Sequence, residues 1–178
     1  MIRCFDAARP GRECIETPTS ATKRSSDGQK GLISALCFNP DYSGAYAAGS
    51  YAHSVGIYVE NSNECVLLLS NLNSGVTCLR WSPCGRYLWI GGRKDSTISC
   101  WDIRQSQTMV GTVPRPLHSN QRILFDVDPW GKYLCTGDQE GHLLFYDCSS
   151  CELVSSVAYE DVPHLVVQDD DDDEEEEE

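Results

Sequence analysis

The sequence has 178 residues, a length that suits one domain, and a formal net charge of −13 at pH 7. The last ten residues, Asp169 to Glu178, are all acidic, so the rest of the chain carries only −3. The net charge therefore excludes a strongly basic nucleic-acid-binding domain and no other class of protein. Any RNA binding requires a local basic patch.

The cysteines and the lack of targeting segments indicate a reducing compartment. The chain has ten cysteines, no signal-peptide pattern and no long apolar run, so we expect a soluble protein with mostly free thiols. Cys148-Ser-Ser-Cys151 has metal-ligand spacing, but no second such pair accompanies it. We expect no metal or cofactor and, because no catalytic motif occurs, no enzyme activity.

The chain begins with a strand-like segment and a polar stretch. Residues 1–6, MIRCFD, end in an aromatic–Asp pair that resembles Trp101-Asp102, which predicts the end of a blade that precedes the first full unit. Residues 7–30 are rich in Gly, Pro, Ser and Thr, which predicts a loop longer than the usual two to six residues or so.

Three similar units of four short strands follow, at residues 31–70, 75–113 and 121–157. Their turn prolines are spaced by 43 and 46 residues, and their turn glycines and strand-end aromatics by 43 and 45. These landmarks are Pro40, Pro83 and Pro129, then Gly49, Gly92 and Gly137, then Tyr58, Trp101 and Tyr146. The spacing matches the period of about 40–45 residues of WD repeats. We therefore predict an all-β fold, a partial WD-repeat β-propeller with three four-stranded blades and a remnant of a preceding blade.

Asp95 lies in the turn of the second unit, where it can accept backbone hydrogen bonds. A side-chain network that holds this blade is predicted to contain Asp95, Thr97 and Trp101. In the other two units the Asp is replaced, by Ala52 or His53 in the first and by Glu140 in the third.

Three blades do not close a ring, because propellers have about four to eight blades. An open arc leaves sheet edges exposed, so we expect the chain to be a fragment of a longer propeller. Residues 158–178 form the expected tail, in which the acidic run 169–178 should be disordered.

One face of the predicted propeller collects side chains suited to RNA. Guanidinium and ammonium groups bind phosphates, amides read base edges and a tyrosine ring stacks on a base. The candidate RNA-binding residues are Tyr51, Arg93, Lys94, Asn120, Gln121 and Arg122. We expect Arg115 and His118, which lie upstream of the last three, and His53 to support this surface.

Four segments of the chain form a more specific pattern. They are ARPGREC (8–14), AGSYAHSVGIY (48–58), RKDSTISCWDIRQS (93–106) and NQRILFDVDPWGKYLCTG (120–137). In this order and spacing they resemble the telomerase Cajal body protein 1 family, also called WD repeat antisense to p53. The chain is similar to the C-terminal part of that family's propeller.

The resemblance implies a non-catalytic RNA-binding protein. Its implied clients are the CAB-box loops of small Cajal body RNAs and of telomerase RNA, together with other ribonucleoprotein components. It would direct them to Cajal bodies and support telomerase assembly. The implied location is the nucleus and its Cajal bodies, with the cytoplasm as a further compartment, and neither DNA nor a membrane is an expected partner.

Two other functions fit the same sequence. One is a generic WD-repeat scaffold for proteins. The other is a substrate receptor of a cullin-4 ubiquitin ligase, whose WDxR motif would consist of Trp101, Asp102 and Arg104. RNA capture lost with Arg122→Glu but kept with Arg104→Ala supports RNA binding, whereas adaptor capture lost with Arg104→Ala supports the ligase.

Overall fold

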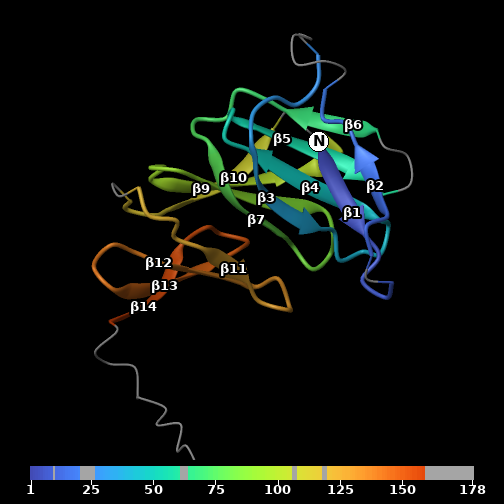
Figure 1. Ribbon diagram of the computed structural model, residues 1–178. Helices are drawn as coiled ribbons and strands as arrows, with labels where there is room; N and C mark the ends of the chain where they lie inside the picture. Colours follow the sequence, from blue (N-terminus) through green and yellow to red (C-terminus); the bar gives the residue numbers. More distant parts are fainter. Residues whose placement is uncertain (10, 21–26, 61–63, 106–107, 118–119, 159–178) are drawn as a thin grey trace, which may run out of the picture.

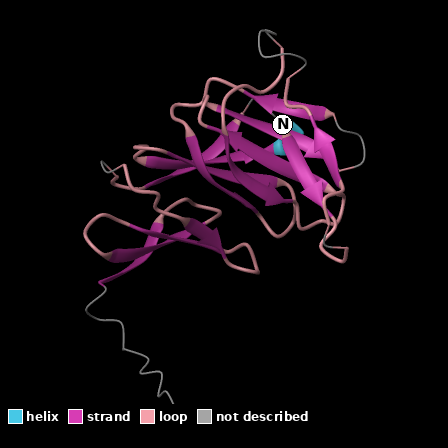
Figure 2. Ribbon diagram, viewed as in Figure 1, coloured by secondary structure: helices cyan, strands magenta, loops and turns pink. Residues whose placement is uncertain are grey.

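The computed structural model describes residues 1–9, 11–20, 27–60, 64–105, 108–117 and 120–158 (Figure 1). These residues form fourteen strands in four antiparallel sheets and one short 3₁₀ helix, η1 (Ile103–Gln105). Figure 2 colours the strands magenta and the helix cyan. No helix in this described part is long and apolar enough to cross a membrane.

Three of the sheets are four-stranded, and in each the strands follow chain order. Blade 1 consists of β3 (Ile33–Phe38), β4 (Ala45–Ser50), β5 (Ser54–Val59) and β6 (Cys65–Leu69). Blade 2 consists of β7 (Val76–Trp81), β8 (Tyr87–Gly92), β9 (Thr97–Asp102) and β10 (Met109–Pro114). Blade 3 consists of β11 (Phe125–Val127), β12 (Tyr133–Gly137), β13 (His142–Asp147) and β14 (Leu153–Ala158). The first strands of the blades are neighbours, because β7 contacts both β3 and β11.

The fourth sheet is the predicted remnant of a preceding blade. It pairs β1 (Ile2–Phe5) with β2 (Cys14–Thr17), and the buried Ile2 packs against Tyr46 and Tyr58 of blade 1. The prediction that 7–30 is a loop is therefore wrong for β2. Its four residues are too few to show a strand pattern, and the strand forms because it pairs with β1 and buries Thr17. The fold class itself is confirmed.

The hydrophobic core lies between the blades rather than within any one of them. One cluster joins blades 1 and 2 around Val55, Val76 and Leu88, and a second joins blades 2 and 3 around Trp89 and Phe125. Blade 2 is therefore buried on both faces, which explains its long runs of apolar residues. Glycine at position 49 follows from this packing, since a Cβ there would collide with the side chain of Val76.

The aromatic residue at the end of the third strand anchors blade 1 through a buried amide. The Tyr58 hydroxyl donates to Gln29 Oε1 at 2.9 Å, and Gln29 Nε2 donates to the carbonyls of Ala48 and Ser54 at 2.6 and 3.2 Å. Burial raises the pKa of Tyr58, so its hydroxyl stays protonated and able to donate. In blade 3 the equivalent Tyr146 hydroxyl donates to the Pro114 carbonyl at 2.5 Å.

Tyr58→Phe should lower the free energy of unfolding by about 1–3 kcal/mol, because Gln29 Oε1 would stay buried without its donor. Urea denaturation of the chain measures this change. Tyr42→Phe is the matched control, because Tyr42 is 99% exposed. Equal stabilities for the two variants would contradict the role of the buried bond.

Candidate nucleic-acid interface

Antiparallel strands place the connections of each blade alternately at two ends. One end carries the β4–β5 turn (51–53), the β8–β9 turn (93–96), the β12–β13 turn (138–141) and the segments that enter β3 (27–32), β7 (70–75) and β11 (115–117 and 120–124). We call this end the candidate face. It contains the described parts of every segment that the sequence predicted to bind RNA.

A continuous line of contacts crosses the candidate face. A Cβ added to Gly75 would lie 2.9 Å from the Tyr51 carbonyl oxygen, and the Gly75 carbonyl accepts the Arg93 backbone N–H at 2.8 Å. The Arg93 guanidinium in turn donates to Asn120 Oδ1 through Nε and Nη2, at 3.3 and 3.2 Å. The structure therefore brings Tyr51, Arg93 and Asn120 together across the tops of adjoining blades.

The other three candidate RNA-binding residues, Lys94, Gln121 and Arg122, lie beside this line and differ in the contacts of their side chains. Lys94 is exposed, adopts a left-handed backbone with φ of 53°, and has no hydrogen-bond or ion-pair partner among the described residues. Arg122 is exposed too, but its Nε donates to the Thr77 carbonyl at 3.0 Å, which fixes it against β7. Gln121 is exposed. Lys94 is thus the cation most available to a phosphate.

Arg115 has a structural role instead of the predicted binding role. It is completely buried, and its guanidinium donates to the carbonyls of Ile123 and Gly92, both at 3.1 Å. Burial lowers the pKa of Arg115, against the opposing effect of the nearby Asp95 carboxylate. The expectation that Arg115 supports the surface directly is wrong, because a side chain buried between blades 2 and 3 cannot meet RNA. His118 lies outside the described residues.

The side-chain network of blade 2 contains Asp95 and Thr97, as predicted, but Ser74 in place of Trp101. Asp95 accepts hydrogen bonds from Thr97 N and Oγ1 at 3.1 and 3.0 Å, and from Ser74 Oγ at 2.9 Å. Trp101 instead donates from Nε1 to Ser99 Oγ at 3.0 Å. Ser74 thus ties the connection before blade 2 to its β8–β9 turn, a link that the sequence analysis missed.

Of the other two blades, only blade 3 forms its turn with a residue different from the one predicted. In blade 1 the His53 ring lies 3.0 Å from the Leu72 carbonyl. In blade 3 it is Asp138, not Glu140, that shapes the turn, because its carboxylate accepts the backbone N–H groups of Glu140 and His142, both at 2.8 Å. Burial opposes ionisation there, but these bonds and the His142 ring hold the pKa of Asp138 below its usual value.

The blade 3 turn therefore contributes negative charge to the candidate face. Its Asp138, Glu140 and His142 ligand atoms lie within 4.8 Å of one another, a grouping that could hold a metal ion. The hydrogen bonds of the turn already occupy Asp138, so the cluster is explained by the turn itself. The positive charge of this face comes from Arg93, Lys94 and Arg122, where blade 2 meets blade 3, and from the exposed Lys30 at the entry to blade 1.

The residues of the alternative WDxR motif lie at the opposite end of blade 2. Arg104 donates to both oxygens of Asp102, from Nε at 3.0 Å and from Nη2 at 2.6 Å. This bond holds the pKa of Asp102 below its ordinary value. The guanidinium is folded back on its own chain, and Trp101 is half-buried.

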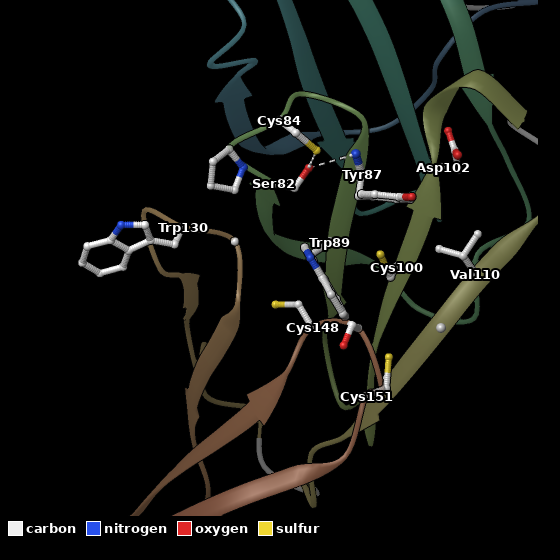
Figure 3. A pocket seen from close by; sticks show the side chains of 14 residues that line it. Ser82, Cys84, Tyr87, Trp89, Cys100, Asp102, Val110, Trp130, Cys148 and Cys151 are labelled. Atoms are coloured by element: carbon white, nitrogen blue, oxygen red, sulfur yellow. Dashed lines mark hydrogen bonds between the residues drawn. The ribbon is translucent and has the colours of Figure 1, made fainter.

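A cavity of about 450 Å³ lies at this opposite end, between blades 2 and 3 (Figure 3). Its walls include Trp89, Trp130 and four thiols, those of Cys84, Cys100, Cys148 and Cys151. Burial raises the pKa of both Cys100 and Cys148 to about 12, so these thiols stay protonated at neutral pH. They act as small apolar residues.

Comparison with known proteins gives the same fold. The WD domain, G-beta repeat family matches residues 63–102. A solved structure described as "Structure of U3-55K" superimposes with a TM-score of 0.63 at 16% identity, covering 74% of this chain and 41% of that one. At this identity the likeness concerns the fold alone.

The sequence is also similar to curated proteins. Telomerase Cajal body protein 1 of Homo sapiens is 39% identical over 146 residues, which cover 82% of this chain and 26% of the relative. The Mus musculus protein of the same name is 37% identical over 83% of this chain. Guanine nucleotide-binding protein negative regulator 1 of Schizosaccharomyces pombe is 38% identical over 61% of this chain and 28% of the relative. The chain spans about a quarter of the length of these relatives.

Arg115→Met should destabilise the chain and loosen the candidate face. It removes the guanidinium donors from the carbonyls of Gly92 and Ile123, which should lower the free energy of unfolding by about 1–3 kcal/mol for each carbonyl. Urea denaturation measures the loss, and hydrogen exchange of the Arg93 amide should become faster. Arg86→Met is the matched control, since Arg86 is exposed at the opposite end. Unchanged exchange of the Arg93 amide would show that Arg115 does not position this face.

The Asp138 turn should make stability depend on pH. Because its folded pKa lies below the ordinary value of 3.8, the carboxylate stabilises the fold at neutral pH, and this contribution disappears as the pH falls through the folded pKa. Asp138→Asn should therefore give a shallower loss of stability on acidification than the unmodified chain. Denaturation between about pH 6 and 3 tests this, and parallel curves for the two proteins would refute it.

Proposed function

We propose that the chain is a non-catalytic RNA-binding protein that recognises an unpaired RNA loop. It is a WD-repeat protein, and 82–83% of its own length resembles Telomerase Cajal body protein 1. The proposed clients are small Cajal body RNAs and telomerase RNA. Their delivery to nuclear Cajal bodies, and support of telomerase assembly, are the proposed outcomes. The relatives' name supports association with telomerase and Cajal bodies.

The observation that carries the proposal is the contact line from Tyr51 through Arg93 to Asn120, with Lys94 beside it. It combines an exposed ring, a guanidinium, an amide and an unpaired ammonium on one face. Sequence-specific RNA recognition targets unstacked bases in loops, which need stacking surfaces and groups that read base edges, while cations hold the phosphates.

The charge distribution favours a loop over a long duplex. Asp138 and Glu140 make the blade 3 end of the candidate face acidic, which would repel an extended phosphate backbone. Three of the basic residues lie at the junction of blades 2 and 3, and Lys30 lies at the same end of blade 1, a small footprint that suits a few nucleotides.

The ligase alternative is less well supported. Its Arg104 is already bound to Asp102 through two donors, so adaptor binding would have to compete with this bond. A generic protein scaffold stays as the alternative if RNA does not bind.

Lys94→Glu should weaken capture of a stem–loop RNA and lower the slope of log affinity against log salt by about 1, because one phosphate contact is lost. Fluorescence anisotropy with a labelled stem–loop that carries a CAB box measures both quantities.

Lys132→Glu is the matched control, since Lys132 lies in the exposed turn at the opposite end, and Arg104→Ala is a second. Both should bind RNA like the unmodified chain. If Lys132→Glu weakened binding as much as Lys94→Glu, the attraction would be general and the candidate face would not be the site. If adaptor protein is captured and lost with Arg104→Ala, the ligase function replaces the proposal.

A further inference from the structure

A second cavity lies beside the candidate face and was not part of the predicted site. It has a volume of about 390 Å³ and extends from the segment before β7 over strands β8, β9 and β10 of blade 2. We propose that this cavity holds one unpaired base of the bound RNA, an inference that rests on the proposed function.

The apolar walls of the cavity suit a flat ring. They are formed by Leu72, Ile90, Trp101 and Met109. The hydrogen bond from Trp101 Nε1 to Ser99 Oγ, at 3.0 Å, fixes the indole. An immobilised indole is a good stacking surface for a base, because its orientation costs no further entropy on binding.

The polar walls offer groups that can read a base edge. Seven of the twelve lining residues are polar, which is unusual for a gap left by imperfect packing of apolar side chains. The side-chain amides of Asn71 and Asn73 are exposed and have no partner among the described residues. Each amide can donate and accept at once, as pairing with a base edge requires.

Asp95 gives the cavity a preference for bases that present hydrogen-bond donors. Its Oδ2 accepts one bond, from Ser74 Oγ, and a carboxylate oxygen can accept two. Position 92 must be glycine for this arrangement, since a Cβ there would collide with Ser74 Oγ. The free lone pair therefore lies in a cavity that the fold keeps open.

The cavity adjoins the residues that are proposed to bind phosphates. Ser74, in its wall, precedes Gly75, whose carbonyl binds the Arg93 backbone N–H. Asp95, also in its wall, directly follows Lys94. A strand whose phosphates rest on Arg93 and Lys94 would therefore pass the end of the cavity formed by Ser74 and Asp95, and a base that enters there would stack on Trp101 farther along β9.

The first experiment probes the cavity without RNA. The ¹⁵N-labelled chain is titrated with AMP, GMP, CMP and UMP while the side-chain amide signals of Asn71 and Asn73 are followed. We expect these signals to shift, most with the base whose edge carries the most donors. The same titration of Asn73→Ala should show a smaller shift at Asn71.

The second experiment measures affinity for the stem–loop RNA. Trp101→Leu should weaken binding by about 5- to 140-fold, the usual range for loss of one stacked base. Asn73→Ala should weaken binding less and, because Asn73 is exposed, should not affect folding. Gln105→Ala, which removes an exposed amide at the opposite end, is the control and should have no effect.

Replacement of single loop bases by abasic sites then identifies the base in the cavity. At the right position, the unmodified chain and Trp101→Leu should bind the abasic RNA equally. RNA binding that is sensitive to Lys94→Glu but not to Trp101→Leu or Asn73→Ala would overturn the cavity proposal and leave the proposed function standing. Shifts with mononucleotides but no binding of the stem–loop would reject the proposed function and overturn the cavity's role in RNA binding, and would leave the cavity as a site for free nucleotides. Neither shifts nor binding would reject both.

Discussion

The packing of each blade's face against the next blade is the constraint on which the structure depends. A four-stranded sheet has two faces, and the apolar residues of blade 2 require a neighbour on each side. Val55 and Val76 lie between blades 1 and 2, and Trp89 and Phe125 between blades 2 and 3. Because this core fixes the blades side by side, the turns at one end of neighbouring blades come into contact, and a surface shared by several blades becomes possible.

The fold could be predicted because similar residues recur at a regular spacing, which indicates a repeated structural unit. Among the recurring glycines, Gly49 has no room for a Cβ because Val76 of the next blade lies against it, and Gly92 has none because of Ser74, whereas Gly137 has room. The glycine landmark therefore follows from close packing in two of the three units. Features that occur once could not be predicted in this way. Strand β2 forms only against β1, and Gln29, in the loop before β3, is bound by Tyr58 of β5, so neither leaves a periodic signal in its own segment.

The sequence was enough to predict which end of the blades carries the candidate site, but not the role of each residue there. Strand alternation alone places Tyr51, Arg93 and Asn120 at one end of the blades. Whether a cation there is free depends on contacts between distant residues, which is why Arg115 proves to be buried and Arg122 is held by Thr77. The cavity beside them was missed for the same reason, since its walls combine residues 71–74 with Trp101 and Met109.

The differences between the blades explain how a repeated scaffold acquires one specific surface. Each blade has a turn at the same end, and these turns satisfy their backbone groups by different means. In blade 2 the carboxylate of Asp95 is bound by Ser74 and Thr97, which leaves Arg93 and Lys94 to face outward. In blade 3 the turn is formed by Asp138 and carries negative charge. The same packing therefore repeats along the arc while its charge does not, and this asymmetry would orient a single RNA strand toward the junction of blades 2 and 3.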